Sequence, residues 1–189
     1  VAPDRIISPE LARHLTAISQ EIGRQVGVLV NRRGQIEDVF VGDAHRIYLP
    51  DIGRARGGQS NLRGLRHIHT VFGRDGLHRD DFADLTKLRL DLVVALEATN
   101  SGQPGKMATA HINPNAHKAK RTIDHVTQDE YRSIYEVEVD FKELVEEIER
   151  ELGRQTKARK ADDGQTRALL VGVYDRKQTA EWRLEEMGS

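Results

Sequence analysis

Cysteine is absent from this 189-residue sequence. Its absence excludes disulfides, thiolate nucleophiles and thiolate zinc sites, and it fits a reducing compartment such as the cytoplasm. No apolar run approaches the roughly 20 residues that cross a bilayer, so we expect no membrane partner. Aromatic residues make up only 5% of the chain, and none lies between the arginines of the basic segments named below, which gives no support to recognition by base stacking.

A net charge of one sign is also lacking, because 29 basic residues face 30 acidic ones. Any attraction to nucleic acid must therefore come from a local patch. The alternative is that the basic loops are solvated and bind no partner. The candidates for contact with RNA phosphates are Arg54, Arg56, Arg63, Arg66, Lys118, Lys120 and Arg121.

Hydrophobic residues, at 38%, are sufficient for a globular core. Ser8, Pro9 and Glu10 form a typical helix start, with a capping hydroxyl, a proline in the first turn and an acid near the positive end of the dipole. Apolar spacing and turn residues predict the other elements. We expect strands over 26–30, 36–41, 46–49, 65–71, 106–112 and 134–139, and helices over 9–22, 79–97 and 141–152. The predicted fold class is α/β (α+β), a mixed β-sheet flanked by helices.

The polar composition of 154–166 predicts a linker between a first domain, 1–153, and a second segment, 167–189. That segment opens with the apolar run 168–173, which is typical of a buried parallel strand, and continues with helical spacing. One strand and one short helix cannot cover both faces of such a sheet. We therefore expect the chain to stop soon after a second α/β domain has begun.

Phosphate-binding glycine patterns are missing, so we expect the chain to bind no nucleotide tightly. We also expect no catalytic residue, because the sequence contains no complete catalytic site. One cluster has the residue types of a metal site. His67 and His69 are two apart on an expected strand and share a face, while Asp81 opens the next helix. The alternative is a pair of ordinary buried histidines and an acid placed at a helix start by the dipole.

The stretch from His69 to Phe72, followed by the stretch from Leu77 to Phe82, resembles the His-x-His-Pro and Ser-x-x-Asp signature of JAMM-type metalloproteases and their RadC relatives. The resemblance assigns His69 as the first zinc ligand and Asp81 as the third. Val71 stands at the second ligand position and His78 at the serine position, and no upstream glutamate can be assigned as general base. The resemblance therefore implies a JAMM/RadC-like fold with a broken site, unless His67 replaces the missing ligand.

A second resemblance covers nearly the whole chain. In order, its blocks are similar to the N-terminal extension of long HflX-type GTPases, and the block at 167–173 is similar to the first strand of the domain that follows. These blocks are residues 7–12, 41–44, 62–66, 68–70, 80–85 and 88–91.

That resemblance implies a non-catalytic N-terminal module that positions or regulates a GTP-binding protein on the ribosome. GTP and magnesium would belong to a domain outside this chain, and ribosomal RNA would be the partner of the parent protein. Two alternatives remain: a JAMM-type zinc-dependent hydrolase that uses His67, His69 and Asp81, and a RadC-like nucleic-acid-binding module.

Overall fold

The computed structural model describes residues 1–53, 61–73, 76–116 and 125–162. Contacts divide the chain into two units, Val1–Gln155 and Thr156–Ser189, and the fold described below is that of the first. Among the described residues, no helix combines the length and the apolar character that a membrane crossing requires.

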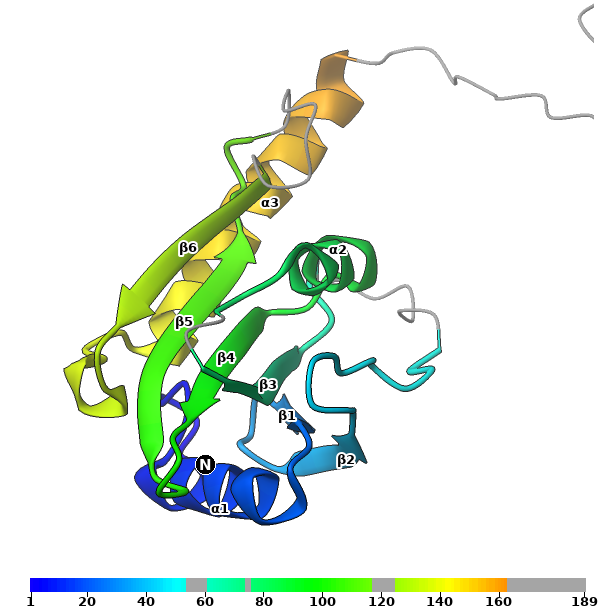
Figure 1. Cartoon of the computed structure of the whole chain (residues 1–189). Coiled ribbons are helices and arrows are strands. Elements are labelled where there is room, and N and C mark those ends of the chain that lie inside the picture. The colour runs from blue at the N-terminus through cyan, green and yellow to red at the C-terminus, as the bar shows by residue number, and fades with distance from the viewer. Residues whose placement is uncertain (54–60, 74–75, 117–124, 163–189) are drawn as a thin grey trace, which may run out of the picture. The chain divides into compact units, whose positions relative to one another are not determined.

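A six-stranded mixed sheet forms the centre of the first unit, in the order β2-β1-β3-β4-β5-β6 (Figure 1). All neighbouring strands are antiparallel except β3 and β4, which are parallel and joined through a helix. The fold class predicted from the sequence is thereby confirmed. The strands are β1 (Val26–Asn31), β2 (Ile36–Val41), β3 (Leu65–Phe72), β4 (Leu92–Ala98), β5 (Pro104–Ile112) and β6 (Val126–Tyr131).

Three α-helices flank the sheet: α1 (Pro9–Ile22), α2 (Arg79–Leu88) and α3 (Phe141–Asp162). The predicted helix start is confirmed, because the Ser8 hydroxyl accepts a hydrogen bond from the Leu11 amide at 3.2 Å. Gly23 ends α1 in the left-handed conformation, with φ 62°. The predicted β1–β2 hairpin is also confirmed.

Alternation along β3 shows which helix covers which face of the sheet. Arg66 stacks its guanidinium over the ring of Phe141 in α3, and Thr70 bonds to Ser19 in α1, so α1 and α3 share one face. His67 and His69 point to the other face, where Asp81 of α2 approaches His69. The histidines therefore lie on the face of the sheet that α2 covers, opposite to α1 and α3.

The prediction of one helix over 79–97 is wrong, because α2 ends at Leu88 and the apolar run that follows is strand β4. Arg89 ends the helix in the left-handed conformation at φ 57°, a role usually taken by glycine. Asp91 then enters the sheet, where its amide donates to the Leu65 carbonyl at 2.8 Å. These contacts with distant residues override the helical spacing of the leucines.

The structure corrects three smaller predictions and adds one strand that the sequence did not predict. Residues 46–49 form no strand, and the stretch expected as a strand at 134–139 begins instead with the 3₁₀ helix η2 (Ile134–Glu136). The last antiparallel strand of the sheet is β6, which the sequence did not predict. Helix α3 continues through Gly153 to Asp162 instead of ending at Gly153. The predicted second segment, 167–189, lies outside the described residues.

Replacing Thr70 by valine is expected to destabilise the fold by about 1–3 kcal/mol. The buried Thr70 hydroxyl accepts from the Val26 amide at 2.8 Å and donates to the Ser19 hydroxyl at 2.8 Å, so Thr70→Val leaves both groups without this partner. Urea unfolding measures the loss. Thr127→Val on edge strand β6 is the matched control and should change the free energy of unfolding by less than about 0.5 kcal/mol.

Candidate functional site

The two histidines of β3 lie on the face of the sheet that α2 covers. Their rings are stacked, with centroids 4.8 Å apart, and the ring of Phe40 lies 5.4 Å beyond that of His67. Phe40 reaches this position across Gly27 of β1, because a Cβ at residue 27 would come within 2.7 Å of the Phe40 ring. The glycine thus lets an aromatic ring from β2 cover the histidines.

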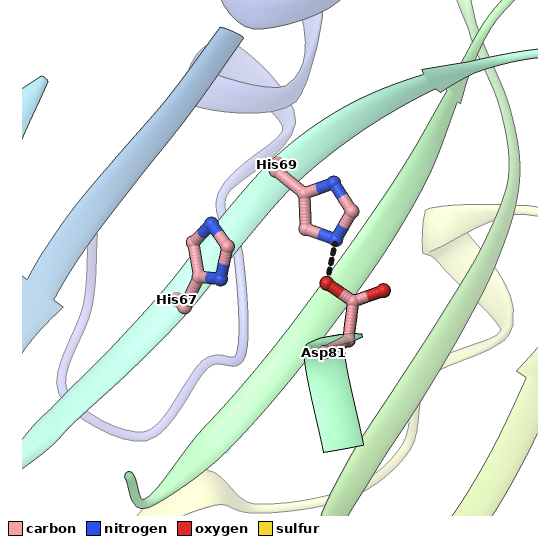
Figure 2. A group of neighbouring side chains, drawn as sticks. All are labelled: His67, His69 and Asp81. Atoms are coloured by element: carbon pink, nitrogen blue, oxygen red, sulfur yellow. Dashed lines mark ion pairs between the residues drawn. The ribbon is translucent and has the colours of Figure 1, made fainter. Parts of the chain in front are cut away.

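Asp81 comes from the first turn of α2. Its Oδ2 accepts a hydrogen bond from the His78 amide at 2.7 Å, and its Oδ1 lies 3.2 Å from Nε2 of His69 (Figure 2). Burial raises the pKa of Asp81, but His69 and the His78 amide outweigh burial and hold that pKa below its ordinary value. The carboxylate is therefore ionised at neutral pH and fixed toward the histidines.

Burial is complete at His67, and it sets the charge of that ring. Desolvation, and then the neighbouring His69, lower the pKa of His67 well below 6.5, although Asp81 acts in the opposite direction. His67 is therefore neutral at pH 7. A neutral imidazole has a free lone pair, which is the form that binds metal ions.

The cluster fits the donor set of a zinc site. The ring nitrogens of His67 and Nδ1 of His69 are buried and have no hydrogen-bond partner in the structure, whereas Nε2 of His69 faces Asp81 Oδ1 at 3.2 Å. One ligand atom from each of His67, His69 and Asp81 can be chosen so that all lie within 4.8 Å of one another. Zinc at about 2.1 Å from each would need them about 3.4 Å apart, so small side-chain rotations would close the site. Two histidines and a carboxylate leave a fourth position open.

A pocket of about 490 Å³ opens beside this cluster, between the segment 45–47 and the start of α2. His69 and Asp81 lie at its wall, with the buried amide side chain of Gln25. The other lining residues are His45, Arg46, Ile47, His78, Arg79 and Asp80. The cluster is therefore within reach of a ligand that enters the pocket.

The structure brings together His67, His69 and Asp81, the three residues that the sequence nominated as weak metal candidates. Val71, at the second ligand position of the JAMM signature, is buried, and His78 is the N-cap residue of α2. The sequence analysis missed Gln25 and Arg46. Neither carries a local signal, because each reaches the pocket only through the packing of β1 and of the segment after β2.

The arginines nominated for phosphate contact have different environments. Arg66 is completely buried against Phe141, so its proposed contact with RNA is corrected. Arg63 donates hydrogen bonds to the carbonyls of Ile52 and Gly53 and so holds its own loop. The remaining candidates, Arg54, Arg56, Lys118, Lys120 and Arg121, lie outside the described residues.

Stability of the chelator-treated protein is expected to fall as pH decreases below about 6.5. The folded-state pKa of His67 lies below its unfolded value, so the unfolded chain binds the proton first and acid favours unfolding. One such group contributes a slope of up to about 1.4 kcal/mol per pH unit. Urea unfolding between pH 7.5 and pH 5, in buffers spaced by about half a unit, should show a shallower slope for His67→Phe. The exposed control His14→Gln should keep the original slope.

Comparison of the chain with protein-family models, with curated proteins and with solved structures finds no match in any of the three. The function is therefore inferred from the residues and their geometry.

Proposed function

We propose that this chain is a non-catalytic, cytoplasmic N-terminal module of an HflX-like GTP-binding protein, which it positions or regulates on the ribosome. GTP hydrolysis, with its magnesium ion, belongs to a domain outside the chain. The proposal rests on the ordered sequence blocks, several of which meet in one part of the fold. Blocks 62–66 and 68–70 form β3 and its approach, and block 80–85 lies in α2, whose Asp81 lies 3.2 Å from His69 of β3.

The observation that carries the non-catalytic part of the proposal is the side chain of Gln25. Gln25 is 4% exposed and lines the pocket beside His69 and Asp81. An amide cannot take a proton from water, whereas zinc-dependent hydrolysis of the JAMM type requires a glutamate as general base. Among the described residues lining the pocket, the carboxylates are those of Asp80 and Asp81, and Asp81 is already bound to His78 and placed against His69.

Ribosome binding is expected to be electrostatic, so affinity should decrease as salt rises. Co-sedimentation of the 189-residue chain with ribosomal particles at several salt concentrations measures this dependence. Replacing Lys118, Lys120 and Arg121 together by glutamine should lower the slope of log affinity against log salt by about 2–3. Lys142→Gln, on the exposed side of α3, is the control and should leave it unchanged.

The same preparation should not hydrolyse GTP. Robust GTP hydrolysis by the purified chain, or the absence of sedimentation at low salt, would refute the proposal. Tight binding to duplex DNA near physiological salt would favour the RadC-like nucleic-acid-binding alternative.

A second candidate is a zinc-dependent hydrolase of the JAMM type, and the spacing of His67, His69 and Asp81 favours it. Zinc bound there would lower the pKa of a coordinated water and polarise a carbonyl oxygen. His67 and His69 would supply neutral nitrogen ligands, and Asp81 a carboxylate held by the His78 amide. Because the amide of Gln25 cannot act as a base, another residue would have to do so, and Asp80 is the carboxylate among the described pocket-lining residues that is not paired with His69.

Metal analysis separates the two candidates. The hydrolase candidate predicts about one zinc per chain in protein purified without added metal, and less than about a tenth of that in His69→Ala and Asp81→Asn. The surface variant His14→Ala should retain full zinc content. Circular dichroism of each variant checks that a loss of metal is not a loss of fold. Metal-free protein that also fails to take up added zinc would exclude this candidate.

A further inference from the structure

We propose that the pocket between the segment 45–47 and the N-terminus of α2 binds a small ligand with a phosphate monoester group, held by Arg46 and Arg79 above the buried His69. This proposal goes beyond the ribosomal function and does not depend on it. It also concerns ligand binding by the chain itself, without a metal ion. The residues that carry it are all described in the structure.

The buried wall of the pocket contains an unsatisfied polar group. His69 is 1% exposed and lines the pocket; its Nε2 lies 3.2 Å from Asp81 Oδ1, and its Nδ1 has no hydrogen-bond partner. Unpaired buried polar groups cost free energy, so their presence next to a cavity points to a ligand that satisfies them. A volume of about 490 Å³ is in the range of small-molecule sites.

Arg46 is held at the pocket by a tight turn. Asp43 Oδ1 accepts hydrogen bonds from the amides of His45 and Arg46, both at 2.7 Å, and the Asp43 amide donates to the Arg46 carbonyl at 2.8 Å. Gly42 permits this packing, because a Cβ there would lie 2.1 Å from the Arg46 carbonyl oxygen. The backbone that carries the guanidinium is therefore fixed before a ligand arrives.

Arg79 is the first residue of α2, a helix of ten residues whose N-terminal end faces the pocket. The positive end of a helix dipole and the amides of its first turn favour an anion. Among the described residues, the ion pairs include none between a carboxylate and Arg46 or Arg79. Two arginines suit a doubly charged phosphate, since each guanidinium can donate two parallel hydrogen bonds to its oxygens.

Asp81, which is ionised and lines the pocket, opposes the binding of an anion. The exposed Asp80 lines the pocket as well, and its negative charge acts in the same direction. Its carboxylate therefore provides a variant that should act in the opposite direction to the arginine variants. A gain of affinity cannot arise from misfolding, so Asp80→Asn keeps the proposal testable even where a loss of binding would be ambiguous.

Inorganic phosphate, titrated into the chelator-treated 189-residue protein and followed by amide NMR shifts, tests the proposal. Binding should shift the amides of the 45–47 segment and of the first turn of α2. Arg46→Gln and Arg79→Gln should each weaken binding about tenfold, and Asp80→Asn should strengthen it severalfold. The exposed Arg13, on α1 and thus on the opposite face of the sheet, gives the matched control Arg13→Gln, which should bind phosphate as the unmodified protein does.

Three outcomes would overturn the proposal: no saturable shift at this pocket, equal weakening by Arg13→Gln, or binding that requires added zinc and ignores both arginines. Displacement of phosphate by RNA with the same arginine dependence would reassign the pocket to a nucleic-acid backbone. Ribosome sedimentation is measured separately on the lysine and arginine triple variant. The failure of one proposal is therefore distinguishable from the failure of the other.

Discussion

Asp91 is completely buried at the start of β4, where its two carboxylate oxygens accept three hydrogen bonds. Arg32 donates from Nε at 2.6 Å and from Nη2 at 3.1 Å, and the Gly64 amide donates at 2.8 Å. Arg32 also donates to Glu149 of α3 at 2.9 Å, and Glu149 accepts from the Asn61 and Leu62 amides. This network joins the β1–β2 turn, the approach to β3, the start of β4 and α3.

Burial and the charges of the partner residues together set the pKa values of Asp91 and Arg32. Burial raises the pKa of Asp91 despite the opposing effect of Arg32, while Asp91 and Glu149 together raise the pKa of Arg32 although burial alone would lower it. Asp91 is completely buried while the Arg32 side chain is 37% exposed, so removing Arg32 would leave a buried carboxylate uncompensated, at a cost of about 3 kcal/mol or less. The network also fixes where α2 stops, since Asp91 is held in the sheet, and so it fixes the β3–α2–β4 crossover that brings Asp81 to His69.

Local chemistry was sufficient to predict α1, the β1–β2 hairpin and β3, because capping residues, glycine turns and β-branched runs act within a few residues. The end of α2 was not predictable in this way. Arg89 adopts a left-handed conformation without being glycine, and Asp91, at the start of the apolar run after it, is held by Arg32, 59 residues away. The helical spacing of Leu85, Leu88 and Leu92 is therefore misleading.

In the candidate site too, some features follow from local sequence and others depend on contacts between distant residues. Strand alternation was enough to place His67 and His69 on one face, and the helix start was enough to direct Asp81 toward them. Arg66 lies in a different environment from the one that its sequence neighbours predicted, which was a solvent-exposed position. Its guanidinium instead lies 4.3 Å from the centre of the Phe141 ring, and desolvation lowers its pKa to about 10. Phe141 is 75 positions later in the sequence, and no local pattern reports such a contact.

The hydrogen bond between Arg32 and Glu149 joins residues 117 positions apart. Closing such long loops has an entropic cost that must be met before the contact forms, and chains rich in distant contacts fold slowly. During synthesis from the N-terminus, the hairpin, β3 and β4 are complete well before Glu149 has been added. The Asn61 and Leu62 amides therefore lack this acceptor until the chain has been extended into α3, so we expect the domain to complete its folding only after α3 has been synthesised.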